Sequence, residues 1–228
     1  MYYYHDIFYI LTLILFVVSM ICSGIVRSRF NRYSKDHTCN GMTGAMAAER
    51  ILRANGITGV TIVQTNGTLT DNYNPTDHTL NLSQEVYGGQ NVSAVAVAAH
   101  ECGHAIQHAQ DYPLLMLRKA LVPVCNIGSI GSYIAILLGF FFSWSGLITL
   151  GAVLFSGIVL FNLVTLPVEV DASRRAMAEV DRLGLLTDEE KVGGQKVLFA
   201  AGMTYFISLM TSIVQLLRLL SIANNRRR

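Results

Sequence analysis

The chain contains few charged residues for its length. Asp, Glu, Lys and Arg make up 14% of its 228 residues, and the mean hydropathy is +0.42. Such a composition is typical of an integral membrane protein and argues against a soluble globular domain. The net charge of +2 gives no sign of a nucleic-acid partner, and we expect none. The basic residues flank apolar runs instead, where lipid headgroups account for them.

Cysteine is also scarce. Cys22, Cys39, Cys102 and Cys125 form no C-x-x-C pair, so nothing in the sequence indicates a disulfide framework. This absence is expected in a reducing compartment.

Three long runs lack charged residues and indicate membrane-spanning helices. Residues 7–26 form an uncharged run of 20 residues, which is enough for a helix to cross the ~30 Å core of a bilayer. Residues 120–168 also contain no charge and are long enough for two spans joined by a turn near Ser143–Gly146. Residues 197–217 form a further run, but its polar residues leave open whether it spans.

Basic residues after the first run predict its orientation. Arg27, Arg29, Arg32 and Lys35 follow it directly, which places the amino terminus outside and residues 27 onward in the cytosol. The run lacks the positive start and the small-residue cleavage site of a signal peptide, so we interpret it as an anchor. A hairpin that leaves and returns brings the segment after residue 168 back to the cytosolic side.

The most informative motif is His100-Glu101-Cys102-Gly103-His104, an H-E-x-x-H sequence in an alanine-rich run over 93–109 that predicts a helix. Two histidines four residues apart lie on one helical face about 6 Å apart, so both imidazoles can bind one metal ion. Glu101 can then lie beside a metal-bound water as its general base. Gly103 is a poor helix former, and its missing side chain would let another element approach closely.

A catalytic zinc ion usually has three protein ligands, so a third must come from elsewhere. His108 is on the same face, but it lies roughly 6 Å beyond His104 by helix rise, too far to share the ion. We interpret His108 as a residue that lies next to the metal ligands or on the surface, not as a ligand. Glu169, the first charged residue after Lys119, is the better candidate and is expected near the start of a helix. Asp171 lies two residues on, roughly on the opposite face, and is expected to play a supporting role.

The segment before the motif has mixed structure. Residues 42–55 have helical periodicity that stops at Gly56, residues 60–63 and 78–82 are predicted strands, and residues 71–75 a loop. The strand over 78–82 suggests an edge that pairs with an extended substrate, while a purely supporting sheet is the alternative. Tyr73, His78, Arg174 and Arg175 are candidates for stabilising an oxyanion, and the sequence does not choose among them.

Four stretches of the chain together resemble one known family. They are "GMTGAMAAERILRANGI", "LTDNYNPTDHTLNLSQEVYGG", "AVAVAAHECGHAIQHAQ" and "LPVEVDASRRA". They are similar to the YugP-like family of membrane-bound neutral zinc metallopeptidases, over about residues 1–220. The resemblance implies zinc ligands at His100 and His104 and a catalytic Glu101. The order of elements also resembles the HtpX type of membrane peptidase, whose E-x-x-A-D pattern is matched at Glu169 and Ala172.

Two positions depart from these patterns. Ser173 stands where the HtpX-type pattern has aspartate, and Cys102 stands where the YugP-like family favours valine. A small, weakly polar thiol can fill the same space as valine.

We therefore expect a mainly α integral membrane protein with three or four transmembrane helices and a small cytosolic α+β, zincin-like segment. Its expected parts are an anchor (1–26), the cytosolic segment with the motif (27–119), a transmembrane hairpin (120–168), a cytosolic helix carrying the third ligand (169–196), and a fourth apolar helix with a basic tail (197–228). It is expected to be a multi-pass protein of the plasma membrane with its site facing the cytosol.

The expected activity is hydrolysis of peptide bonds. One zinc ion per chain would be held by His100, His104 and Glu169, with Glu101 as general base, acting on peptides or membrane-protein segments at the lipid bilayer. A non-proteolytic zinc-binding membrane adaptor is the alternative, against which the intact Glu101 counts. A carrier that holds another metal or haem on the face of His100, His104 and His108 is a third reading. The sequence indicates neither a particular substrate nor an oligomeric state.

Overall fold

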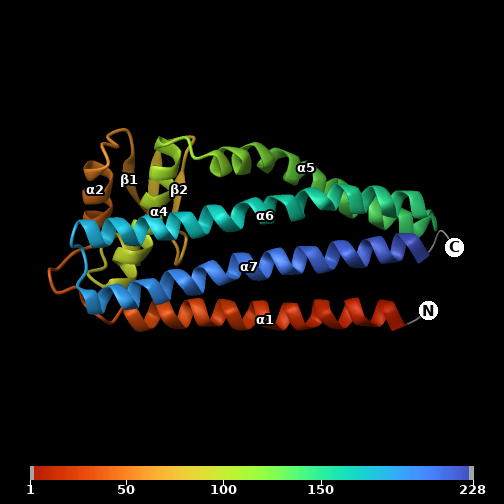
Figure 1. Ribbon diagram of the computed structural model, residues 1–228, viewed down its shortest axis with the longest axis horizontal. Helices are drawn as coiled ribbons and strands as arrows, with labels where there is room; N and C mark the ends of the chain where they lie inside the picture. The colour runs from red at the N-terminus through yellow and green to blue at the C-terminus, as the bar shows by residue number, and fades with distance from the viewer. Residues whose placement is uncertain (1–2, 226–228) are drawn as a thin grey trace. The chain divides into compact units, whose positions relative to one another are not determined.

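Helices account for most of the chain, as its long apolar runs predict. The computed structural model describes residues 3–225, with side chains from residue 7 to residue 224, and this range contains seven helices and three strands (Figure 1). In order they are α1 (Tyr3–Tyr33), α2 (Gly44–Ala54), β1 (Thr61–Thr65), β2 (Asn72–Asn74), β3 (Thr79–Ser83), α3 (Gln84–Tyr87), α4 (Val92–Ala109), α5 (Pro113–Phe141), α6 (Ser145–Arg182) and α7 (Asp188–Asn225). The predicted basic tail, Arg226–Arg228, lies outside the described residues.

Four helices within the described range, α1, α5, α6 and α7, are long and apolar enough to cross a membrane. The break between α5 and α6 falls at residues 142–144, which overlap the turn expected near Ser143–Gly146. The fourth apolar run, which the sequence left open, belongs to α7 and is one of the candidate spans. Its Thr and Ser side chains do not prevent this, because hydroxyls within a helix can bond to its own carbonyls, as Thr211 does to Ile207 at 2.8 Å.

One predicted helix boundary is wrong. Glu169 was expected near the start of a helix, but α6 runs without interruption through Pro167 to Arg182. Long membrane helices tolerate an internal proline because neighbouring groups satisfy the freed carbonyl. Glu169 therefore lies inside a helix, and the dipole of a helix start does not act on it.

The interruption comes instead at residues 183–187, between α6 and α7. Thr187 and Glu190 form the capping box at the start of α7, with Thr187 N donating to Glu190 Oε2 at 2.8 Å and Glu190 N to Thr187 Oγ1 at 3.3 Å. No catalytic role is needed to explain these two residues.

The chain divides into two compact units. The first, here called the helical unit, consists of the described parts of residues 1–22, 116–167 and 204–228, which are apolar segments of the four long helices. Within it, α5 and α6 are joined by Ser132, whose hydroxyl donates to the Gly151 carbonyl at 2.8 Å. Many of its large apolar side chains are exposed, Ile127 and Leu137 among them, as expected where lipid takes the place of protein contacts.

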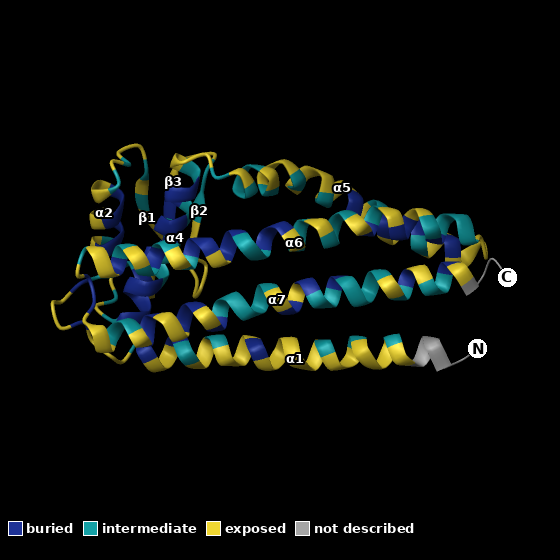
Figure 2. Ribbon diagram, in the orientation of Figure 1, coloured by how far each residue is buried: buried dark blue, intermediate teal, exposed yellow. Residues whose placement is uncertain are grey.

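The second unit, here called the mixed unit, consists of residues 23–115 and 168–203. It contains the sheet and most of the buried core, and Figure 2 shows α4 largely buried whereas the apolar run of α1 is largely exposed. Ala47, Ala48 and Ile51 on α2 are fully buried and belong to the same core as α4. The motif helix is thus part of the buried core of this unit.

The sheet corrects two expectations. Its strand order is β1-β3-β2, with β3 parallel to β1 and antiparallel to β2. The strand at 79–83 is therefore central, with neighbours on both sides, and has no free edge for a substrate. Its alternating Leu80 and Leu82 are fully buried, which explains why the pattern looked like a strand. The predicted loop at 71–75 contains β2, which is an edge strand of this sheet.

Candidate metal centre

Helix α4 carries the H-E-x-x-H motif, and most of its residues are buried. Asn91 caps its first turn, because its side-chain oxygen accepts a hydrogen bond from Ala94 N at 2.9 Å. The small residues before the motif allow neighbours to approach, and a Cβ on Gly194 of α7 would lie 3.3 Å from the Cβ of Ala96. The small side chains therefore allow this helix to pack closely against its neighbours, and the polar residues of the motif lie at the candidate site.

Gly103 marks the place where α6 crosses α4. A Cβ at this position would lie 3.0 Å from the carbonyl carbon of Ala172 and 3.1 Å from its Cα, closer than the ~3.5–4.0 Å of ordinary carbon contacts. The missing side chain thus admits a second element, as the sequence predicts. That element carries Glu169, one turn of helix before Ala172.

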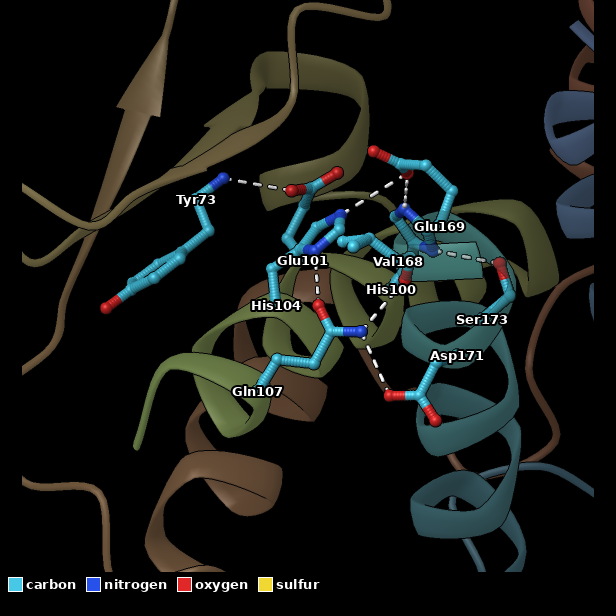
Figure 3. A network of polar contacts seen from close by, with 9 residues as sticks. All are labelled: Tyr73, His100, Glu101, His104, Gln107, Val168, Glu169, Asp171 and Ser173. Carbon is cyan, nitrogen blue, oxygen red and sulfur yellow. Dashed lines mark hydrogen bonds and ion pairs between the residues drawn. The ribbon is translucent and has the colours of Figure 1, made fainter. Parts of the chain in front are cut away.

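His100, His104 and Glu169 come together at this crossing (Figure 3). His100 Nε2 lies 3.3 Å from Glu169 Oε2, and His104 Nε2 lies 3.4 Å from the same oxygen. Each of the three offers one donor atom within 4.8 Å of the others. Their side chains are only 15%, 12% and 2% exposed, so the cluster is largely shielded from water.

This spacing fits a tetrahedral metal ion. Ligand atoms at 2.0–2.2 Å from a tetrahedral zinc ion are about 3.3–3.6 Å apart, which is the range of the two separations from Glu169 Oε2. Two imidazoles and one carboxylate also form a donor set that zinc accepts in catalytic sites, with a fourth position left for water. The residues present therefore fit zinc in both chemistry and distance.

The second nitrogen of each imidazole also has a partner. His100 Nδ1 lies 3.1 Å from the hydroxyl of Ser173, and His104 Nδ1 lies 3.0 Å from Gln107 Oε1. Metal-binding histidines usually make such a contact, which fixes the ring and leaves the other nitrogen for the metal. Both rings are thus oriented with Nε2 toward Glu169.

Glu101 lies beside this cluster and is 8% exposed. Its Oε2 accepts a hydrogen bond from the backbone N–H of Tyr73, on strand β2, at 2.9 Å. Burial raises the pKa of the Glu101 carboxyl above its usual range, and the neighbouring His100 and His104 only partly oppose this. A carboxylate with a raised pKa is a stronger base near neutral pH.

The pKa of His104 is raised above its ordinary value. Burial alone lowers it, but the hydrogen bond and the charge of Glu169, with a contribution from Glu101, outweigh burial. A proton therefore competes with a metal ion for His104 Nε2, and binding of a metal ion must displace it.

His108 lies apart from the three donor atoms, as its distance along the helix predicts. Its Nδ1 shares a hydrogen bond of 2.8 Å with the hydroxyl of Tyr73, and its ring stacks on His78 with centroids 5.4 Å apart. Tyr73 thus holds β2 to α4 at two points, through its N–H to Glu101 and through its hydroxyl to His108.

Asp171 is bound by three neighbours on the other side of the cluster. Its carboxylate accepts hydrogen bonds from Gln107 Nε2 at 3.0 Å, from Arg174 at 3.0 Å and from Arg175 at 2.5 Å. Arg175 also donates to Gln110. Four residues were candidates for stabilising an oxyanion. Two of them, Arg174 and Arg175, are paired with Asp171, and the other two, Tyr73 and His78, contact His108.

Cys102 faces away from the donor atoms. Its thiol donates to the Ala48 carbonyl on α2 at 3.7 Å, and burial raises its pKa well above the usual value. It is therefore a neutral packing group between α4 and α2, as expected where valine would otherwise stand.

Comparison with known proteins places the chain in a family. Residues 8–224 match a family described as "Putative neutral zinc metallopeptidase". The chain belongs to this family. A curated relative from Bacillus subtilis (strain 168), "Putative membrane protease YugP", is 43% identical over 202 residues, which cover 89% of this chain and 90% of the relative. No solved structure matches the chain.

Family membership agrees with the features of the structure. The printed names refer to zinc, to a protease and to a membrane, and the chain has a three-donor cluster that can hold a metal ion and four helices that can cross a membrane. The resemblance to the YugP-like family is therefore confirmed.

Sequence reasoning missed three contributors to the site. Gln107 follows His104 by three residues and so lies on the same helical face, a signal that was present but not used. Ser173 was noted only as a departure from a pattern, yet its hydroxyl occupies the place beside His100. The backbone of Tyr73 gave no signal, because the sequence around it is rich in turn-forming residues.

Proposed function

We propose that this chain is an integral-membrane zinc metalloendopeptidase. The observation that carries the proposal is the set of three donor atoms, His100 Nε2, His104 Nε2 and Glu169 Oε2, at spacings that suit tetrahedral zinc, with Glu101 beside them. The family and its curated relative support a zinc-dependent protease in a membrane.

The proposed roles follow from the contacts of each side chain. When bound to His100, His104 and Glu169, zinc would polarise the scissile carbonyl and lower the pKa of its water toward ~7. Glu101 would take the water proton and deliver it to the leaving amine. Its Oε2 is held by Tyr73 N–H, so Oε1 is the atom that would carry the proton. The raised pKa of Glu101 suits both acceptance and release.

Strand β2 is proposed to align the substrate in place of β3. The Tyr73 N–H donates to Glu101, so this side of β2 faces the motif rather than β3. An extended peptide beside that edge would lie across the donor cluster. Methylation of the substrate's backbone nitrogens next to the cleaved bond should then lower kcat/KM, and unchanged cleavage of such peptides would exclude pairing with β2.

The site is proposed to face the cytosol of a multi-pass plasma-membrane protein. Arg27, Arg29, Arg32 and Lys35 follow the apolar run of α1 and lie in the mixed unit, which contains the site. A reporter enzyme that is active only outside the cytosol, fused after residue 228, should be active, because four spans return the chain to the side of its amino terminus. Activity of that reporter only when it is fused after residue 35 would reverse the proposed orientation.

The decisive experiment is hydrolysis of an unstructured protein such as casein by the detergent-purified chain. Wild type should cleave it, a chelator should abolish cleavage, and added zinc should restore it. The matched variant is Glu101→Gln, which keeps the size of the side chain and should lower kcat by roughly 10²–10⁴ while zinc is retained. Equal activity of Glu101→Gln and wild type would exclude the proposed general base and favour a contaminating protease.

A further inference from the structure

The sheet of the mixed unit has two edge strands, and the proposed hydrolysis uses only one of them, β2. The other edge strand is β1, because the strand order β1-β3-β2 leaves one side of it without a neighbouring strand in the described part of the chain. On its other side β1 pairs in parallel with β3, and the Thr61 N–H donates to the His78 carbonyl at 2.9 Å.

The backbone groups of β1 alternate in direction along the strand. The N–H and C=O groups of Thr61 face β3, and so do those of Val63 and Thr65, whereas those of Ile62 and Gln64 face away from the sheet. Within residues 3–225, these four outward groups of Ile62 and Gln64 have no hydrogen-bond partner. A strand edge with unpaired N–H and C=O groups can pair with another strand.

β1 lacks the features that usually protect such an edge. Proteins commonly place charged residues or proline on an exposed edge, shorten the strand or interrupt it with a bulge. Residues 54–70 contain neither a charged residue nor proline, and the five residues of β1 pair with β3 in a continuous register. Val63, a residue with a high preference for strands, is 38% exposed, while Ile62 on the other face packs against the core.

The β2 edge differs from the β1 edge in each of these respects. β2 consists of only three residues, Asn72–Asn74, and Pro75, which has no N–H, follows it directly. The N–H of Tyr73, which faces away from β3, is already donated to Glu101. Of the three described strands, β1 is therefore the one that offers a free edge to another strand.

The outward groups of β1 match a second β1 strand that is related to it by a two-fold axis. In an antiparallel pair with the axis at Val63, Ile62 of each copy lies opposite Gln64 of the other. Both residues direct their N–H and C=O groups outward, so each of the two pairs exchanges two hydrogen bonds. The two Val63 side chains then face each other in the pair between them, and no like charges meet at the axis.

We propose that β1 pairs antiparallel with β1 of a second copy of this chain and so forms a homodimer. The two sheets then become one sheet of six strands in the order β2-β3-β1-β1-β3-β2. Both outer edges are β2 strands, so the contact is closed and assembly stops at two chains. The inference goes beyond the proposed function and does not depend on zinc.

Disulfide cross-linking in membranes tests both the contact and its register. Val63→Cys is made together with Cys39→Ser, which removes the one exposed cysteine among the described residues. Opposite residues in a pair without hydrogen bonds have Cα atoms about 4.5 Å apart, within the range that a disulfide bridges. Mild oxidation should therefore link Val63→Cys chains into a species of twice 25.1 kDa.

Thr61→Cys, in the same Cys39→Ser background, is the matched control. Thr61 is also exposed and lies on the same face of β1, but the proposed register places it opposite Thr65 of the second copy. The two copies of residue 61 are then four residues apart along the strand, about 13 Å, which is too far for a disulfide. Equal cross-linking of Thr61→Cys and Val63→Cys would indicate random collision and overturn the proposed pairing.

The mass of the protein in mild detergent, measured by light scattering, provides the second test. Wild type should have about twice the mass of one 25.1 kDa chain, and Val63→Lys, which brings two positive charges together at the axis, should have the mass of one chain. Val63→Thr keeps a β-branched, uncharged side chain and should remain a dimer. Because Val63 is exposed, thermal unfolding should show that both variants are folded.

Three results would overturn the proposal. The first is a monomeric wild type whose Val63→Cys variant does not cross-link. The second is a dimer that persists in folded Val63→Lys, because its contact would then lie elsewhere. The third is cross-linking of Val63→Cys to a protein of another mass, which would assign the β1 edge to a different partner. Zinc content and peptidase activity are measured separately, so any of these results leaves the proposed function standing.

Discussion

Gly103→Ala is expected to separate the two halves of the metal site. The added methyl group would lie 3.0 Å from the carbonyl carbon of Ala172 and 3.1 Å from its Cα, and both neighbours are backbone atoms that cannot rotate away. The Ala172 carbonyl oxygen would be closer still, so restoring ordinary contacts of ~3.5 Å requires α4 and α6 to move apart by more than about 0.5 Å. A metal site tolerates changes of only about 0.2 Å in its ligand distances, so Glu169 would be drawn away from the two histidines.

The size of the effect follows from the cost of overpacking. Forcing an extra methyl into a tight contact costs about 1–3 kcal/mol, which corresponds to roughly a 5- to 150-fold loss of zinc affinity if the strain is relieved by opening the site. Alanine is a better helix former than glycine by about 1 kcal/mol, which offsets part of this cost in the metal-free protein. Zinc affinity should therefore fall more than thermal stability does.

Competition with a zinc chelator and thermal unfolding in detergent measure the two quantities. Gly202→Ala is the matched control, because a Cβ at this helical position of α7 meets no atom within 4 Å. It should bind zinc as wild type does. Equal zinc affinity of Gly103→Ala, Gly202→Ala and wild type would show that the close crossing does not set the metal site.

Three further predictions concern the neighbours of the donor atoms. Tyr73→Phe removes the hydrogen bond to His108 and should lower the free energy of unfolding by about 0.5–1.5 kcal/mol, with unchanged zinc content by elemental analysis. Ser173→Ala removes the partner of His100 Nδ1 and should weaken zinc binding by about tenfold or more, whereas unchanged affinity would show that this contact is dispensable. Zinc affinity should fall as the pH is lowered through the raised pKa of His104, by about tenfold per pH unit for each proton displaced, and a flat profile there would argue that His104 is not a ligand.

The donor residues could be predicted from the sequence because each follows from a short-range rule. The helical period places His100 and His104 on one face, and the long absence of charge makes Glu169 conspicuous after Lys119. The close approach at Gly103 could also be predicted locally, because a glycine in a helix has no side chain to keep a neighbouring element away. These inferences need no knowledge of which elements lie side by side.

The rest of the site depends on long-range geometry. The order β1-β3-β2 cannot be derived from alternation, so the sequence left open whether the strand at 79–83 is an edge or part of a supporting sheet, and β2 was predicted as a loop. Val168 and Asp171 reach Gln107 only because α6 continues straight through Pro167, where the sequence suggested a new helix. Local patterns thus identified the atoms that can bind the metal but not those that orient them.

The most direct test of the account is the zinc content of detergent-purified wild type and Glu169→Ala, measured side by side by elemental analysis, with thermal unfolding to confirm that both are folded. The account predicts about one zinc ion per wild-type chain and a clear loss in the variant, because a catalytic zinc ion is usually held by three protein ligands and Glu169 is the only one from α6. Full zinc occupancy in folded Glu169→Ala would contradict the three-ligand site, and absence of zinc from wild type would contradict the proposed function itself.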